Sequence, residues 1–180
     1  MRRRGFNREG LAAVLPVLDG REDELGESLE AMPAGRASPF ARIASTHFAR
    51  LVLLDEFPGR NGGTLADMPA CLFFAAEFDI PVAGYLEALC ALLRDEADAI
   101  FGTCVGYPGA NVPPLVTDWM LRHRVRPGFS ILGNPEASVR QVVDSLTLRE
   151  RIIAFALETR SLPPVALKDA WDAQDWGTAS

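Results

Sequence analysis

The sequence predicts a mixed α+β fold, and three observations support this prediction. Short apolar segments of strand length are bounded by Gly, Pro or Asn turns. Between them lie segments whose apolar residues recur every three or four positions, such as Leu25, Leu29 and Met32. The chain has 180 residues, of which 48% are hydrophobic, a size and composition that suit one packed core.

The expected elements follow one another as strand, helix, strand, strand, helix and strand. In chain order they cover residues 11–17, 21–32, 46–55, 70–78, 81–93 and 99–105. The second and third strands are expected to form an antiparallel hairpin, because a turn region with Asn61, Gly62 and Gly63 separates them. This order is the split βαβ repeat of ferredoxin-like domains, in which both helices cover one face of an antiparallel sheet.

A C-terminal extension of helix, strand and helix follows this repeat. We expect a helix over 115–123, a strand over 128–132 and a helix that begins near Ser138 and stops at Pro163 and Pro164. The sequence therefore predicts a single domain over residues 1–160 and a tail over 161–180. Trp171 and Trp176 in the tail are expected to dock on the body or on a partner chain.

Composition argues against several classes of function. The net charge of -6 opposes binding to a phosphate backbone, so nucleic acid is not an expected partner. No run reaches the roughly 18 apolar residues that a membrane helix needs, which predicts a soluble, cytoplasmic protein with no membrane partner. Cys71, Cys90 and Cys104 are expected to be reduced thiols, and with only His47 and His123 they form no recognisable metal site.

His47 and Arg50 open an otherwise apolar strand, and ionisable groups beside a core need partners. Strand alternation places the two on opposite faces, so a β-bulge would be needed to bring both into one cavity. We predict that His47 acts on a ligand, because an imidazole exchanges a proton near neutral pH and a guanidinium does not. The equally open interpretation is a structural residue satisfied by Asp79 or Glu77.

The other candidate residues lie nearer the C-terminus. His123, in the basic segment 122–126, is expected to cap a helix end, although the cluster would suit a carboxylate or phosphate if it faced a cavity. Tyr107 follows the last predicted strand and either donates to a ligand or packs its ring and satisfies its hydroxyl on backbone. Cys104 is expected to be a buried, inert thiol unless a nearby cation lowers its pKa.

Three segments carry a resemblance to a known group of proteins. They are Ser38-Pro-Phe-Ala-Arg42, Thr46-His-Phe-Ala-Arg50 and Cys104-Val-Gly-Tyr-Pro108. Together with the order of elements, they resemble uncharacterised bacterial proteins of the dimeric α+β barrel superfamily, over roughly residues 8–157. That group is expected to have a histidine before the cysteine and an acid after it, where this chain has Thr103 and Val105. A reaction that depends on that histidine would be lost here.

The resemblance implies a cavity between sheet and helices, and a homodimer made by packing two sheets face to face. The superfamily includes haem peroxidase-like enzymes, cofactor-independent monooxygenases and non-catalytic binders, so the fold alone does not select a function. We expect no stable haem, because neither histidine has a convincing second hydrogen-bond partner in the sequence.

The leading hypothesis is a small-molecule enzyme of oxidoreductase type, peroxidase-like or monooxygenase-like. His47 or Arg50 would place or deprotonate an apolar or aromatic substrate. The expected cavity lining consists of Phe48, Phe73, Phe74, Phe78, Cys104 and Tyr107. The alternative is a non-catalytic ligand-binding or assembly protein of the same fold.

Overall fold

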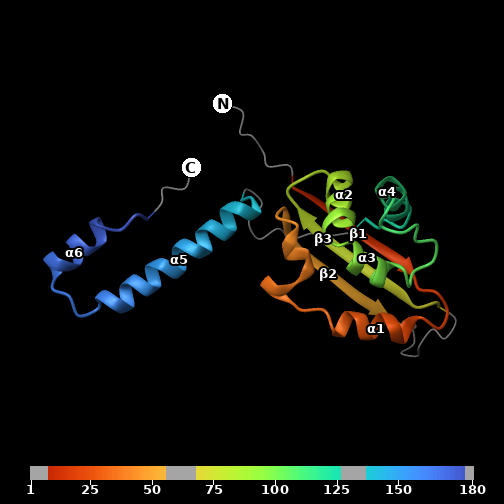
Figure 1. Ribbon diagram of the computed structural model, residues 1–180, viewed down its shortest axis with the longest axis horizontal. Helices are drawn as coiled ribbons and strands as arrows, with labels where there is room; N and C mark the ends of the chain where they lie inside the picture. The colour runs from red at the N-terminus through yellow and green to blue at the C-terminus, as the bar shows by residue number, and fades with distance from the viewer. Residues whose placement is uncertain (1–7, 56–67, 127–136, 177–180) are drawn as a thin grey trace. The chain divides into compact units, whose positions relative to one another are not determined.

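The structure is a computed structural model that describes residues 8–55, 68–126 and 137–176 and shows a mixed α+β architecture (Figure 1). It divides into two compact units, Met1–Glu136 and Ala137–Ser180. This division groups the long helix after Ser138 with the C-terminal segment, whereas the predicted domain over residues 1–160 includes that helix. The predicted strand over 128–132 lies outside the described residues.

The first unit contains a three-stranded antiparallel sheet within the described residues. Its strands are β1 (Glu9–Pro16), β2 (Thr46–Leu54) and β3 (Cys71–Phe78), in the order β1-β3-β2. β3 pairs antiparallel with both neighbours, which confirms the predicted hairpin of β2 and β3. β1 and β2 therefore run in the same direction on either side of β3.

Four α-helices follow the strands in the order that the sequence predicts, and two more, over Arg94–Phe101 and Pro164–Asp172, are additions. The first unit holds α1 (Glu22–Glu30), α2 (Val82–Leu92), α3 (Arg94–Phe101), α4 (Pro113–Arg122) and two 3-10 turns, η1 (Gly35–Ala37) and η2 (Pro39–Arg42). The second unit holds α5 (Val139–Thr159) and α6 (Pro164–Asp172). The predicted start of α5 is confirmed, since Ser138 and Gln141 form a reciprocal capping box at its N-terminus.

The core lies between one face of the sheet and the helices of the first unit. Alternate strand residues such as Leu15, Phe74 and Phe78 are fully buried there, as the period of two along a strand requires. α2 contributes Tyr85, whose ring stacks on Phe78 with centroids 4.0 Å apart. α4 contributes Trp119, which is 1% exposed.

The predicted fourth strand over 99–105 is wrong, because its first half belongs to helix α3. Ala97, Ile100 and Phe101 are buried on one side of α3, at spacings of three and four residues. A short apolar run fits a buried strand or a buried helix equally well, and here the acidic first turn at Asp95 and Glu96 favours the helix.

The outer edge of β1 is nevertheless occupied by two short backbone segments. Val17 pairs with Cys104 and Ala13 pairs with Arg124 in isolated antiparallel bridges. Val105 N donates to Pro16 O at 2.8 Å, and Val125 N donates to Ala12 O at 2.8 Å. The segment after α3 and the segment after α4 thus share the edge position that a fourth strand would take.

Candidate functional site

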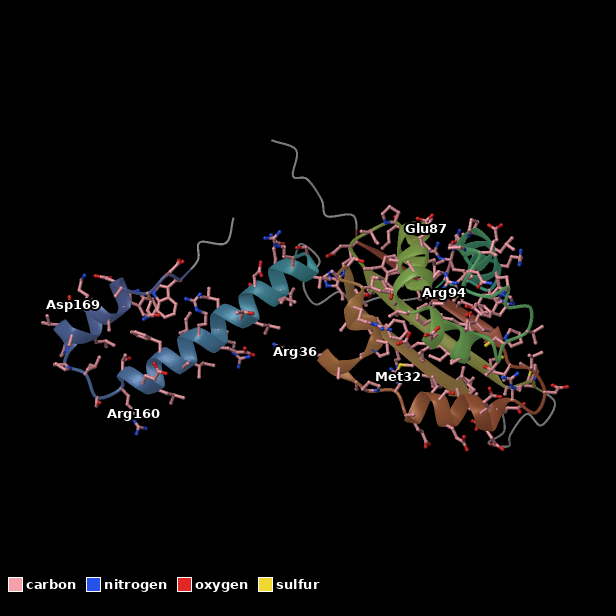
Figure 2. All side chains as sticks on the ribbon, in the orientation of Figure 1. Met32, Arg36, Glu87, Arg94, Arg160 and Asp169 are labelled. Carbon is pink, nitrogen blue, oxygen red and sulfur yellow. The ribbon has the colours of Figure 1, made fainter. Side chains whose placement is uncertain are left out.

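A cavity of about 350 Å³ lies beside α1, the two 3-10 turns and the first half of β2. Figure 2 labels Met32, which follows α1 in the chain and belongs to the lining of this cavity. The apolar part of the lining includes Leu29, Met32, Phe40, Ala49 and Leu51. The polar side chains of the lining are Ser38, Thr46 and His47, and among the described residues His47 is its only ionisable one.

A β-bulge at the start of β2 places His47 at this cavity. Thr46 pairs with Phe78 and Phe48 pairs with Glu77, so one extra residue, His47, stands between two consecutive pairs. Both Thr46 and His47 consequently line the cavity, although strict alternation would send them to opposite faces. The bulge is a local feature of chain pairing that the residue pattern alone does not reveal.

His47 is fixed by a carboxylate. Its Nε2 lies 2.6 Å from Asp79 Oδ1, and the two side chains are 9% and 15% exposed. This contact confirms Asp79 as the partner suggested by the sequence. A carboxylate accepts hydrogen bonds, so Nε2 carries the proton and, in the neutral imidazole, Nδ1 keeps its lone pair. In the described part of the chain, His47 makes one side-chain hydrogen bond, and it runs through Nε2 to Asp79.

Three buried hydroxyl oxygens belong to residues around this pair: Ser45 and Thr46 precede His47 in the chain, and the Tyr85 ring of α2 stacks on Phe78 beside Asp79. Those of Ser45, Thr46 and Tyr85 have no well-formed hydrogen bond among the described residues. Burial raises the pKa of Tyr85 to about 12, and the proximity of Thr46 offsets part of that effect. A buried hydroxyl without a hydrogen-bond partner destabilises the folded protein, unless a bound ligand or water supplies that partner.

The structure does not bring the other predicted lining residues to this cavity. Phe74 and Phe78 are fully buried in the core, whereas Phe73 points to the opposite face of the sheet. Phe48 is 43% exposed on that opposite face, near Arg50, which is also exposed. His47 and Arg50 therefore lie on opposite faces as predicted, and the four phenylalanines do not form one lining.

Tyr107 and Cys104 lie elsewhere and have structural surroundings. Tyr107 OH donates to Asp98 Oδ1 at 2.9 Å, and the backbone N–H of Ala110 donates to the same oxygen at 2.8 Å. Burial and this carboxylate both raise the pKa of Tyr107. Burial also raises the pKa of Cys104 to about 11, which disfavours the reactive thiolate.

The basic segment 122–126 lines neither this cavity nor the second one described below. His123 is the C-terminal cap of α4, and its Nδ1 lies 2.9 Å from Trp119 O. Arg124 donates to Gly10 O at 3.0 Å. These contacts confirm the expected capping role for His123 and tie the end of α4 to β1.

The segment between α1 and β2 is the part of the site that sequence reasoning missed. It separates the first cavity from a second one of about 640 Å³, and Met32, Pro33, Ser38 and Ala41 line both. Arg42 on this segment pairs with Glu96 of α3 at the second cavity. The signal was visible as a stretch rich in Gly, Pro and Ser, which is typical of binding loops but does not specify their shape.

Comparison with known proteins assigns no family to this arrangement. No family model matches the chain, and neither a curated protein nor a solved structure matches it.

The described residues offer neither a metal site nor a membrane-spanning helix. Within residues 8–55, 68–126 and 137–176, no group of three or more His, Cys, Asp or Glu side chains is placed to hold a metal ion. None of the helices in these ranges combines the length and apolar character that crossing a lipid bilayer requires.

Proposed function

We propose that the protein is a small-molecule enzyme in which His47, oriented by Asp79, accepts a proton from an apolar or aromatic ligand bound beside β2. The observation that supports this proposal is the His47–Asp79 contact of 2.6 Å at the wall of an otherwise uncharged cavity. A histidine held by a carboxylate is the usual arrangement of a general base, because the carboxylate fixes the tautomer and stabilises the imidazolium that forms.

The proton transfer follows from the geometry of the pair. A ligand O–H or acidic C–H placed at Nδ1 loses its proton, an Nδ1–H bond forms, and the electron pair of the broken bond stays on the ligand. The positive charge that develops on the ring lies next to the Asp79 carboxylate, at a site with little solvent. The product of this step is a ligand anion held in an apolar cavity.

The reaction class that we propose is cofactor-independent oxidation of the oxidoreductase type, with dioxygen as co-substrate. The ligand anion passes one electron to dioxygen, which leaves a ligand radical and superoxide. These two combine to a ligand peroxide, which loses water, so that one oxygen atom stays on the oxidised ligand and the other leaves as water. Deprotonation by His47 is the step that the protein supplies. A peroxidase-like reaction would need haem, and the only histidine at the cavity has its Nε2 engaged by Asp79. We therefore favour the monooxygenase-like alternative of the two.

The cavity also supports a proposal for the ligand class. A volume of about 350 Å³ is near the small end of ligand sites, which suggests a compact molecule. None of the described lining residues is Arg, Lys, Asp or Glu. A charged ligand would therefore find no side chain of opposite charge in the lining while His47 is neutral. A neutral aromatic molecule with one ionisable hydroxyl fits both the lining and the pair.

Two probes that differ in one hydroxyl test this proposal. 1-Naphthol and naphthalene would be titrated into the protein at neutral pH, with absorbance recording the fraction of bound naphtholate. We expect 1-naphthol to bind about tenfold more tightly, which corresponds to one additional hydrogen bond. We also expect naphtholate to form on binding, and oxygen consumption to rise when the probe is present.

Two variants separate the role of His47 from general effects on the surface. His47→Gln should lose both the preference for 1-naphthol and the naphtholate signal. Arg50→Gln, on the opposite face of the sheet, should retain both. Equal affinity for the two probes, or an unchanged naphtholate signal in His47→Gln, would contradict the proposal.

The second candidate is a non-catalytic ligand-binding or assembly protein. Apolar side chains that remain exposed favour it, including Phe48 on the sheet and several residues of α5. Tight binding of 1-naphthol without naphtholate formation or oxygen consumption would support this candidate over the enzyme.

We also propose the finer fold and setting that the sequence suggested. A ferredoxin-like repeat is supported by the order β1-α1-β2-β3-α2 and by the two bridges on the outer edge of β1. A homodimer is supported by the sheet face that carries Phe48 and Phe73, where the Phe48 side chain is 43% exposed. The three free, buried cysteines support a reducing compartment such as the cytoplasm.

A further inference from the structure

Helix α5 carries an apolar stripe that its own unit leaves exposed. Val143, Leu146, Ile153 and Leu157 are 51%, 41%, 48% and 63% exposed, although each is a large hydrophobic residue. They lie on one side of the helix, because their spacings of three, seven and four residues return to the same face. Only Phe155 of α5 is buried among the described residues.

The other helix of the unit does not reach this stripe. Trp171 and Trp176 pack edge-on against Phe155, with ring centroids 5.5 and 5.4 Å away. Phe155 is two residues from both Ile153 and Leu157, which places it roughly 160° around the helix from the stripe. α6 is also shorter, with 9 residues against the 21 of α5. Figure 2 labels Arg160 at the end of α5 and Asp169 on α6, the two arms of this hairpin.

The spacing of the stripe is that of a coiled-coil seam. Positions 139, 146 and 153 form one set separated by seven residues, and positions 143, 150 and 157 form the other, with alternating steps of four and three. Val139, Val143, Leu146, Ile153 and Leu157 occupy five of these six positions. The sixth is Glu150, a polar residue inside the seam of the kind that specifies how two helices pair.

We infer that the α5 stripe is a homodimer interface in which α5 of one copy packs antiparallel against α5 of a second copy. A heptad stripe is complementary to another heptad stripe, since each side chain inserts between residues with the same spacing on the facing helix. The seam spans the full length of α5, so the two α5 helices form a two-stranded coiled coil, and each α6 packs on the outer side of its own α5.

The charge of Glu150 favours an antiparallel over a parallel arrangement of the two α5 helices. A parallel pair would place the two Glu150 carboxylates side by side in one layer of the seam, which like charges disfavour. In the antiparallel pair, residue 150 faces residue 146 of the second copy, and the adjacent Arg149 lies within reach of the second copy's Glu150. Two arginines and two glutamates then meet at the centre of the seam with no net charge.

Sedimentation of the full chain tests the inference. We expect the wild-type protein to be a dimer at concentrations of about 10 µM and Leu146→Asp to weaken the dimer by at least about tenfold. Leu115→Asp is the matched control, because Leu115 is an exposed leucine on α4, with 50% exposure against 41% for Leu146. It should leave the dimer unchanged.

A cross-linking experiment tests the orientation. Residues 139 and 157 of opposite copies face each other only in the antiparallel seam, so a mixture of Val139→Cys and Leu157→Cys chains should form a disulfide-linked heterodimer. The native cysteines Cys71, Cys90 and Cys104 are buried and give a low background. Cross-linking of Leu157→Cys with itself would show a parallel seam and overturn the orientation.

Two outcomes of the sedimentation experiment would overturn the interface. One is a monomeric wild type. The other is a Leu146→Asp dimer of unchanged strength, which would favour the sheet face as the dimer interface.

Discussion

Replacing tyrosine by phenylalanine at positions 85 and 107 is expected to change the free energy of unfolding in opposite directions. The two side chains look alike from the sequence, and both rings are packed against other aromatic rings. They differ in what their hydroxyls touch. Tyr107 OH donates to the Asp98 carboxylate at 2.9 Å, whereas Tyr85 OH is buried without a well-formed hydrogen bond among the described residues.

The magnitudes follow from these surroundings. Tyr107→Phe removes a hydrogen bond to a charged acceptor in a half-buried site and should lower the free energy of unfolding by about 1.5–3 kcal/mol. Tyr85→Phe keeps the ring that stacks on Phe78 and removes only an oxygen that is costly to bury, so it should raise the free energy of unfolding by up to about 1 kcal/mol.

Urea denaturation followed by circular dichroism measures both changes in the same protein. Unchanged dependence on urea would show that each variant alters the folded state and not the extent of unfolding. A loss of stability in Tyr85→Phe as large as that in Tyr107→Phe would mean that the Tyr85 hydroxyl has a partner in the folded protein. The reasoning about its burial would then be refuted.

The remaining predictions concern alkaline pH and the His47–Asp79 pair. The chain has two tyrosines, both with a raised pKa, so the folded protein should show little tyrosinate absorbance at pH 10. Because folding raises the pKa of Tyr85 to about 12, the free energy of unfolding should keep the full contribution of this group below pH 10. That contribution should decline as the pH rises toward about 12. For the pair, a double-mutant cycle with His47→Gln and Asp79→Asn should give a coupling of about 1.5–3 kcal/mol, because the contact is charge-assisted and mostly buried. A coupling near zero would mean that Asp79 does not orient His47.

Much of the sheet could be predicted because its strands are long apolar runs between turn residues. The pairing of β2 with β3 was predicted from the turn residues between them in the sequence, and the opposite faces of His47 and Arg50 follow from the period of two. The helical half of the segment over 99–105 could not be predicted in the same way. Ala99, Ile100 and Phe101 are too few to distinguish the two periods, and the burial of Ile100 against the core decides the outcome.

The cavity could not be predicted because two non-periodic features create it. One is the bulge at His47, which depends on how β2 pairs with β3. The other is the segment from Pro33 to Arg42, whose 3-10 turns shape the wall opposite. The sequence left Asp79 and Glu77 as alternative partners for His47, and the structure selects Asp79.

The paired outer edge of β1 has a consequence for how this protein behaves at high concentration. An uncovered strand edge recruits strands from other molecules and seeds aggregation. Here the backbone N–H groups of Val14, Leu18, Val105 and Val125 are all engaged along that edge, although the two segments that cover it are not adjacent in the chain. Opening the whole edge requires both segments to detach, the one that follows α3 and the one that follows α4, so these amides should exchange with solvent slowly.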